Sequence, residues 1–243
     1  MIIMTQIEAF QEKAKQLAGS FYFTFLNERP SITAWFLELT EKGLELHAPA
    51  HTKFSPLFID FSSCLQRSKQ FNREDILARA ITKNKKERLH VLDVTAGLGR
   101  DAFLLASIGH KLTLVERHPV LAAMLSVAIS RAKKNGSQIA DRMTFIFDDS
   151  EHYLSMLSEK PDVIYIDPMF PKRSKSSLVK REMQTLQQLV GAHDDSTLLA
   201  RALQKAQRRV VVKRPAKGEH LDGQVPTFQL TSKTHRFDIY ACL

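Results

Sequence analysis

The stretch Val91–Asp101, VLDVTAGLGRD, decides the fold of this chain. An apolar strand ends in Asp93, and a turn that carries Gly97 and Gly99 follows it. An apolar helix then begins at Arg100. Strand, glycine turn and helix form the first unit of a doubly wound α/β domain, in which ligands bind at the carboxyl ends of the strands. Glycine at both turn positions leaves backbone without Cβ atoms, on which a ligand can lie closely.

A second strand, LTLVE, ends in Glu116, 17 residues after Gly99. An acid at this place accepts hydrogen bonds from both hydroxyl groups of a nucleoside ribose. The pair of features therefore predicts a site for a nucleoside cofactor. The pattern Gly97-x-Gly99-x-x-Ala102 also satisfies the dinucleotide fingerprint, so an NAD-type cofactor is an alternative. Its pyrophosphate would bind at the N-terminus of the following helix.

The charge of the loop favours a different nucleoside. Asp101 occupies the first turn of the helix, where its carboxylate would compete with a phosphate group. S-adenosylmethionine has no phosphate and carries a sulfonium and an ammonium group, which suit an acidic loop. We expect Asp93 to lie near its methionine end, with Asp101 and Arg100 close by. These residues favour the methyl donor over NAD.

A third apolar strand, DVIYID, leads into Asp167-Pro168-Met169-Phe170. Asp-Pro alone commonly marks a turn. The tetrapeptide, however, resembles the Asp/Asn-Pro-Pro-Tyr/Phe motif of methyltransferases that act on planar amino groups. Asp167 and the Pro168 carbonyl would hold the two amine hydrogens, and Phe170 would stack on the base. Met169 departs from the usual second proline, and Thr95 replaces a glycine that many such enzymes have in the first loop.

Four runs of sequence resemble the ribosomal RNA small subunit methyltransferase J family: DVTAGLGRDAFLLAS, DPMFPKRSKSSLVKREM, VVVKRP and HRFDIYA. They occur in order over about the last two thirds of the chain. The resemblance implies methylation of the exocyclic N2 of a guanosine of 16S rRNA, at position 1516 in the usual rRNA numbering. It also implies an S-adenosylmethionine site formed by Arg100, Asp101, Glu116, Arg117, Asp149, Ser150 and Asp167.

Length and composition agree with a nucleic-acid enzyme. The 243 residues are 44% hydrophobic, enough for a full core, and carry a net charge of +9. A basic balance of this size suits a polyanionic partner. Cys64 and Cys242 form neither a disulfide framework nor a metal-binding spacing, so we expect no metal and a reducing compartment. No signal peptide or membrane-spanning run is evident, which predicts a soluble, cytoplasmic protein.

We expect a small N-terminal β-rich subdomain over residues 1–71, followed by the methyltransferase domain over residues 72–243. The first part would contain a helix at 2–18, a strand at 21–25, a hairpin turning at 40–43 and a strand within 54–61. It is predicted to act as a lid or packing layer, or alternatively to grip RNA. The second part would form a Rossmann-like seven-stranded sheet whose last strand is antiparallel. Its further predicted helices cover 72–83, 119–134, 176–190 and 196–207, and its further strands 143–147, 209–213, 225–230 and 237–242.

Basic residues follow the amine motif and the strand at 209–213. Lys172, Arg173 and Lys175 come directly after Phe170, where they would contact backbone phosphates of a bound nucleotide. Lys213 and Arg214 lie at a strand carboxyl end, on the same side. A charged loop without this function is the alternative for the first group.

The sequence thus favours a class I S-adenosylmethionine-dependent methyltransferase with Asp167, Pro168 and Phe170 as catalytic residues and the small ribosomal subunit or its 16S rRNA as partner. Two alternatives stay open. One is amino methylation of a different target, such as DNA adenine or a protein glutamine amide. The other is a non-catalytic role in RNA binding or ribosome assembly.

Overall fold

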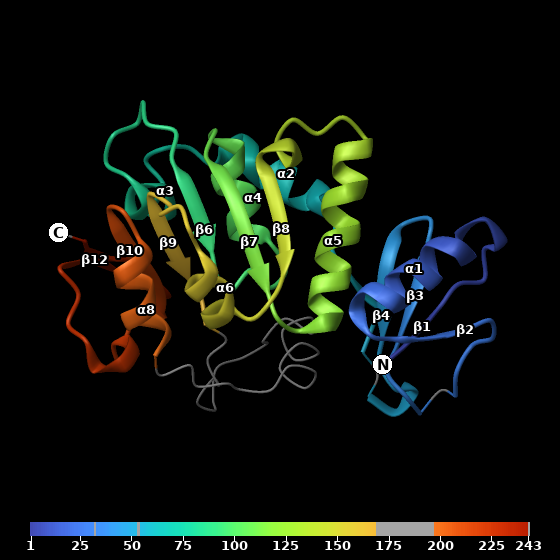
Figure 1. The fold of residues 1–243 in the computed structure, drawn as a ribbon. Helices are drawn as coiled ribbons and strands as arrows, with labels where there is room; N and C mark the ends of the chain where they lie inside the picture. Colours follow the sequence, from blue (N-terminus) through green and yellow to red (C-terminus); the bar gives the residue numbers. More distant parts are fainter. Residues whose placement is uncertain (32, 53, 169–196, 243) are drawn as a thin grey trace. The chain divides into compact units, whose positions relative to one another are not determined.

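The computed structural model describes residues 1–31, 33–52, 54–168 and 197–242. These residues form two compact units (Figure 1). Unit 1 contains Met1–Asp60 and His118–Arg131, and unit 2 contains Phe61–Arg117, Ala132–Pro168 and the described part of Asp194–Leu243. The expected domain boundary between residues 71 and 72 stays a prediction.

Unit 1 contains a five-stranded sheet, which confirms the expected β-rich subdomain. The strand order is β2-β1-β3-β4-β5, with β1 parallel to β2 and β3, and β4 antiparallel to β3 and β5. Its strands are β1 (Ile2–Met4), β2 (Thr24–Leu26), β3 (Phe36–Thr40), β4 (Gly43–His47) and β5 (Leu57–Phe58). Its helices are α1 (Gln11–Phe21), α5 (Pro119–Lys134, whose last three residues belong to unit 2) and two 3-10 turns at Glu8–Phe10 and Ala50–Thr52.

The prediction of a helix at residues 2–18 was wrong for its first residues. Ile2–Met4 form an extended strand because this short apolar run pairs with neighbours on both sides, and tertiary pairing overrides helical periodicity. The helix starts only at Gln11. The strand expected at 21–25 begins three residues later, at Thr24, whereas the hairpin of β3 and β4 is confirmed.

Unit 2 contains the predicted seven-stranded sheet, in the order β11-β12-β10-β9-β6-β7-β8. The last strand of the chain, β12, runs antiparallel to both of its neighbours, and the other neighbouring strands of this sheet pair in parallel. Its strands are β6 (His90–Asp93), β7 (Lys111–Glu116), β8 (Met143–Phe147), β9 (Val163–Ile166), β10 (Arg209–Pro215), β11 (Phe228–Thr231) and β12 (His235–Ala241). Its helices are α2 (Phe61–Gln70), α3 (Ile76–Ile81), α4 (Arg100–Ser107), α6 (Ser150–Met156) and α8 (Leu198–Lys205), with 3-10 turns at Ala140–Arg142 and Leu221–Gly223.

Two helical segments of unit 2 differ from the predictions. Helix α2 was not predicted, because its sequence FSSCLQRSKQ is mostly polar. The helix expected at 72–83 is shorter in the structure and consists of α3 alone, because local hydrogen bonds form a turn before it. Asn72 Oδ1 accepts the Glu74 N–H at 2.7 Å, and Asp75 Oδ2 accepts the Asn72 N–H at 2.7 Å. The predicted helix at 176–190 lies outside the described residues.

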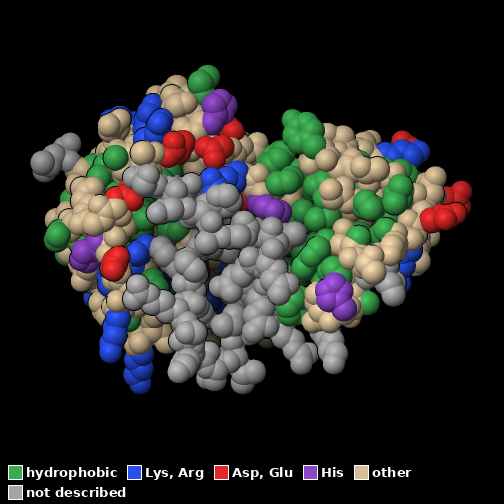
Figure 2. All heavy atoms as spheres, turned by 90° about the horizontal axis from the view of Figure 1, so that it is seen from below, with side chains coloured by type: hydrophobic (Ala, Val, Ile, Leu, Met, Phe, Trp, Pro, Cys, Tyr) green, Lys and Arg blue, Asp and Glu red, His purple; other side chains and the backbone are tan. Residues whose placement is uncertain are grey.

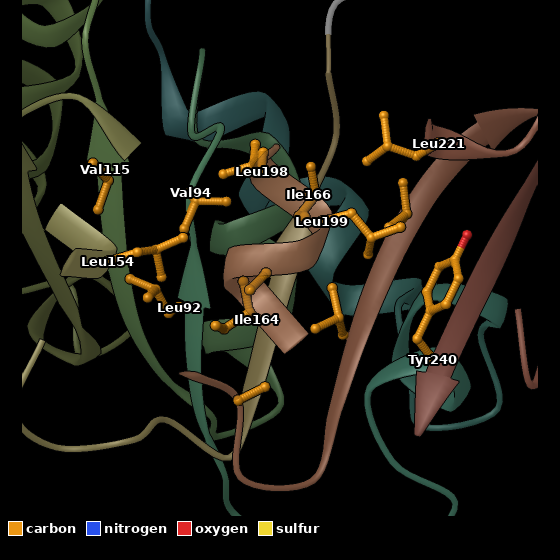
Figure 3. Packing of buried hydrophobic residues seen from close by; sticks show 14 residues of the cluster. Leu92, Val94, Val115, Leu154, Ile164, Ile166, Leu198, Leu199, Leu221 and Tyr240 are labelled. Carbon is orange, nitrogen blue, oxygen red and sulfur yellow. The ribbon is translucent and has the colours of Figure 1, made fainter. Parts of the chain in front are cut away.

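Alternating residues of the central strands form a buried cluster on one face of the sheet. Leu92 and Val94, Ile164 and Ile166, and Val210 and Val212 belong to one buried cluster (Figure 3). Residues of α6 and α8 complete it, and both helices lie on the same face of the sheet (Figure 1). Each fully buried aliphatic side chain contributes roughly 2 kcal/mol through the hydrophobic effect. The residues that alternate with them along the strands point to the opposite face, which places polar groups such as Asp93 and Lys213 away from this cluster. No helix in the described part of the chain is long and apolar enough to cross a membrane.

Candidate active site

The carboxyl ends of the parallel strands of unit 2 lie along one edge of the sheet. Most of these strands end in a charged residue or are followed by one. Figure 2 views the molecule from the side of this edge, and both acidic and basic side chains of described residues are visible there. The residues are Asp93 on β6, Glu116 on β7, Asp149 after β8, Asp167 after β9 and Lys213 on β10. This convergence is the arrangement expected for a ligand site in a doubly wound sheet.

The glycine turn joins β6 to α4 in the conformation that the sequence predicts. Gly97 has φ +53° and Gly99 has φ +68°, in the left-handed region that favours glycine. The Gly97 N–H donates to Glu116 Oε2 at 2.9 Å, so the acid at the end of β7 also holds the turn. The first turn and the predicted ribose acceptor are therefore joined directly.

Asp93 is almost completely buried, with 3% of its surface exposed. Its Oδ1 accepts the Thr95 N–H at 3.0 Å. Burial raises the pKa of Asp93 to about 8, and the nearby Asp101 and Asp167 add to this rise. A cationic ligand beside Asp93 would favour its charged form and lower its pKa again.

A lysine bridges two of the predicted site residues. Lys213 Nζ donates to Asp101 Oδ2 at 2.7 Å and to Asp167 Oδ2 at 2.8 Å. The Tyr165 hydroxyl donates to the same Asp101 oxygen at 2.8 Å. Burial raises the pKa of Asp101, but the Lys213 ammonium outweighs it, and the pKa lies below the usual value. Asp101 therefore stays ionised at neutral pH.

Asp167 begins the predicted amine motif and is anchored through its backbone. Its N–H donates to Thr95 Oγ1 at 2.6 Å, which ties the end of β9 to the glycine turn. The side chain of Asp167 is 36% exposed. Burial raises the pKa of Asp167 to about 6, with Lys213 opposing the rise and Asp101 adding to it. Pro168 is described and partly buried, whereas Phe170 lies outside the described residues.

The expected contacts after β7 and β8 lie close to each other. Arg117 Nη1 lies 3.5 Å from Asp149 Oδ2. The other oxygen of Asp149 accepts the N–H groups of Glu151 and His152 and caps α6. The buried Ser150 hydroxyl donates to the Val94 carbonyl, beside the glycine turn. Arg117, Asp149 and Ser150 thus border the site, and their contacts with a cofactor stay a prediction.

The basic residues proposed to contact RNA occupy different environments. Lys213 lies between the two carboxylates described above. Arg214 is 8% exposed, and its Nε donates to the Glu219 carbonyl at 2.6 Å. Lys172, Arg173 and Lys175 lie outside the described residues. Arg100, which was expected at the cofactor and not at RNA, is the first residue of α4 and is exposed.

Sequence reasoning missed two residues that organise the site. Thr95 was noted only as a departure from glycine, yet its hydroxyl accepts the Asp167 N–H. Tyr165 was part of an apolar strand, yet its buried hydroxyl binds Asp101. A signal existed for Tyr165, because a phenol inside a buried strand needs a hydrogen-bond partner.

The donor set fits S-adenosylmethionine better than a phosphate-bearing cofactor. Three carboxyl groups surround the start of α4, where a pyrophosphate would need donors rather than acids. Asp93, with its pKa near 8, would be stabilised as a carboxylate by a sulfonium or ammonium group. The described residues contain no group of three or more His, Cys, Asp or Glu side chains that could hold a metal ion.

The chain is similar in sequence to known methyltransferases. A family model described as putative SAM-dependent methyltransferase matches residues 24–242. Ribosomal RNA small subunit methyltransferase J of Proteus mirabilis is 44% identical over 214 residues, covering 85% of this chain and 86% of that protein. The protein of the same name from Thioalkalivibrio sulfidiphilus is 42% identical over 241 residues, covering 96% and 94%.

The fold also matches a solved structure. The crystal structure of a SAM-dependent methyltransferase from Neisseria gonorrhoeae superposes with a TM-score of 0.80 at 32% sequence identity. The match covers 100% of this chain and 96% of that chain. Both the seven-stranded sheet and the preceding β-rich part are thus included in the comparison.

Proposed function

The chain belongs to the ribosomal RNA small subunit methyltransferase J family of S-adenosylmethionine-dependent methyltransferases, and on this premise we propose that it methylates the exocyclic N2 amine of guanosine 1516 of 16S rRNA. The observation that carries the proposal is the placement of Asp167. It follows β9 at the strand edge, its backbone is held by Thr95, and its carboxylate is bound by Lys213. An acceptor held in this way suits an amine that must be aimed before it reacts.

S-adenosylmethionine supplies an activated methyl group when it is bound, and Asp93, Asp101 and Glu116 are the residues that would hold it, with Arg117, Asp149 and Ser150 at the border. The residues of the chain must bind the amine and orient it toward the methyl group. A guanine amine is weakly nucleophilic because its lone pair is delocalised into the ring. Asp167 accepts one N–H of the amine and takes up its proton as the new bond forms, while the Pro168 carbonyl accepts the other N–H. Holding the amine in line contributes much of the rate, because orientation removes an entropic cost.

The guanosine must be unpaired or turned out of its stack to reach this edge, as in other enzymes that modify bases. We propose that Phe170 stacks on the base and that Lys172, Arg173 and Lys175 contact the adjacent phosphates. The net charge of +9 supports such a partner. A protein with this substrate works in the cytoplasm.

Replacing Asp167 tests the proposal. We expect Asp167→Ala to lower single-turnover methyl transfer to 16S rRNA by about 100-fold or more, the scale of a lost acid–base group. Folding, followed by circular dichroism, should be retained because Asp167 is partly exposed. Calorimetry measures S-adenosylmethionine binding separately, because Asp167 is also among the residues expected at the cofactor. The control is Asp141→Ala, which alters an exposed carboxyl in the turn before β8. Near-normal transfer by Asp167→Ala would remove the proposed role.

The class of substrate is tested separately with labelled methyl donor. Small ribosomal subunits, free 16S rRNA, adenine-containing DNA and a glutamine peptide are offered to the same enzyme. We expect label in the rRNA samples alone. Label in DNA or peptide would overturn the proposed target, and S-adenosylmethionine binding without transfer to any sample would favour a non-catalytic role in RNA binding.

A further inference from the structure

Lys213 stands out because it was expected at a phosphate and lies instead between two acids. Its ammonium contacts Asp101 at 2.7 Å and Asp167 at 2.8 Å, and only 27% of its side chain is exposed. Asp101 belongs to the predicted cofactor site and Asp167 to the amine motif. One side chain thus joins the group that would hold the methyl donor to the group that would hold the methyl acceptor.

The sheet determines the position of this lysine. Val212 on β10 pairs with Ile166 on β9, so the next residues along the two parallel strands, Lys213 and Asp167, emerge side by side. On its other side Lys213 pairs with the buried Phe237 of β12. The backbone of Lys213 therefore belongs to a strand that pairs with neighbours on both sides, rather than to a loop.

Among the described residues, the acids at this edge outnumber the cation that bridges them. The carboxyl group of Asp93 on β6 lies near the like-charged Asp101 and Asp167. The Tyr165 hydroxyl on β9 forms a hydrogen bond with Asp101. From other elements, Arg67 of α2 acts on Asp101, and His235 of β12 faces Lys213. Among these groups, Lys213 is the one that donates hydrogen bonds to both Asp101 and Asp167.

The protonation states agree with this placement. Burial lowers the pKa of Lys213, but Asp167 and Asp101 outweigh it and hold the pKa above the usual value, so the ammonium stays charged. Burial raises the pKa of Asp167 to about 6, and Lys213 is the main group that opposes a larger rise. Without the lysine, Asp167 would keep a proton closer to neutral pH, and that proton would compete with the N–H of the amine for the carboxyl oxygens.

We propose that Lys213 is a positioning residue for methyl transfer: its ammonium bridges Asp101 and Asp167 and holds Asp167 as an oriented, ionised acceptor for the amine of the substrate. This inference rests on the proposed function for its catalytic consequence. The contact between the lysine and the two acids, and its effect on Asp167, stand without it. A contact with an RNA phosphate is the competing role for Lys213, and the two roles predict different kinetics.

Two substitutions separate charge from shape. Lys213→Met keeps an unbranched side chain and removes the ammonium, and Lys213→Arg keeps a positive charge. Lys213→Gln is a second neutral variant in case methionine impairs folding. Lys111→Met is the control, because Lys111 is an exposed lysine at the amino end of β7, away from this edge.

Single-turnover transfer is measured from about pH 5 to about pH 9, where the limbs of a pH–rate profile report essential acids and bases. In the wild type the rate should fall as the pH drops through about 6, as Asp167 becomes protonated. For Lys213→Met we expect a rate at neutral pH about 10-fold to 100-fold lower, an acidic limb moved upward by about one pH unit or more, and partial recovery at high pH. Lys213→Arg should keep the limb near its wild-type position.

The protonation of Asp167 is followed directly by carbon-13 NMR of labelled aspartate carboxyls, with Asp167→Asn identifying the signal. We expect a higher apparent pKa for this carboxyl in Lys213→Met, and this readout is valid even if the wild type transfers no methyl group to rRNA. Inactive wild type would thus refute the proposed function alone. An unchanged Asp167 titration, or a defect limited to a higher KM for RNA and a weaker salt dependence of binding, would overturn the proposal and assign Lys213 to a phosphate.

Discussion

Two clusters of buried charge in unit 2 are built from similar residues and balanced differently. We call Asp93, Asp101, Asp167 and Lys213 the acid cluster, and Arg236, Asp238, His220 and Gln229 the arginine cluster. In the arginine cluster Asp238 is fully buried and accepts from Arg236 Nε at 2.8 Å, Arg236 Nη2 at 3.1 Å and Gln229 Nε2 at 3.0 Å. Burial raises the pKa of Asp238, but Arg236 and His220 outweigh it, and the pKa lies below its usual value.

Asp93 in the acid cluster is buried almost as deeply, yet its pKa rises to about 8. Its hydrogen-bond donors are the Thr95 N–H and hydroxyl, which carry no charge. The arginine cluster balances its own charge, because the Arg236 guanidinium pairs with the Asp238 carboxylate. Arg236 also donates to the Gly218 carbonyl at 2.7 Å and so holds the loop after β10. A buried carboxylate with its own cation thus supports the fold, whereas the excess of buried acid among the described residues marks the place for a cationic ligand.

The largest loss of stability is expected from breaking the arginine cluster. Asp238→Asn leaves the Arg236 guanidinium buried beside a neutral partner, and removing one partner of a buried ion pair costs about 3–5 kcal/mol. We expect a lower urea midpoint with an unchanged slope. The control is Glu74→Gln, which breaks the exposed pair of Glu74 with Lys85 and should leave the midpoint unchanged. Equal midpoints for the two variants would contradict the comparison.

An effect of opposite sign is expected in the acid cluster, and it grows as the pH rises. The folded protein keeps the Asp93 proton up to about pH 8, whereas an unfolded aspartate loses it near the usual value of 3.8. Between these values the folded state binds more protons, so this group makes stability fall as the pH rises, by up to about 1.4 kcal/mol per pH unit.

Asp93→Asn should therefore be more stable than the wild type at pH 8, with the difference shrinking toward pH 4. Asparagine keeps a carbonyl oxygen that can accept the Thr95 N–H. Urea denaturation across this range measures the difference. Curves that run parallel would show that Asp93 is ionised in the folded protein and that the cluster holds no excess of acid.

The smallest effect concerns the turn beside the acid cluster. Among the described residues, an added Cβ at Gly97 would meet only the Thr95 carbonyl oxygen, at 3.8 Å, so the expected cost of Gly97→Ala comes from its φ of +53°. We expect a loss of about 1 kcal/mol. Gly19→Ala is the matched control, because Gly19 lies within α1 with no atom near the added Cβ, and alanine there should stabilise by about 0.5–1 kcal/mol. A stabilising Gly97→Ala would contradict the need for a left-handed turn.

The sequence predicted those parts that depend on local pattern. The strands that end in Asp93 and Glu116 and the helix Pro119–Lys134 follow from periodicity, glycine and proline, and the structure confirms them. Ile2–Met4 could not be assigned from periodicity, because its strand exists only through pairing with β2 and β3.

The sequence predicted the acidic residues of the candidate site but not the hydrogen bonds that join them. Asp101, Glu116 and Asp167 follow from motif and family resemblance, since each ends a strand or opens a helix. The place of Lys213 depends on strand order, because β10 lies next to β9 only through the crossover of the sheet. Three-dimensional register, rather than residue type, therefore decides whether a lysine at this edge meets a phosphate or two carboxylates.

The most direct test of the account is to locate the methyl group that the enzyme adds. Small ribosomal subunits and free 16S rRNA from cells that lack this gene are incubated with the enzyme and labelled S-adenosylmethionine, and the product is analysed by nucleoside digestion and site mapping. We predict label in N2-methylguanosine at position 1516 and at no other site. Label in another nucleoside, or no label on either rRNA sample while S-adenosylmethionine still binds, would contradict the account.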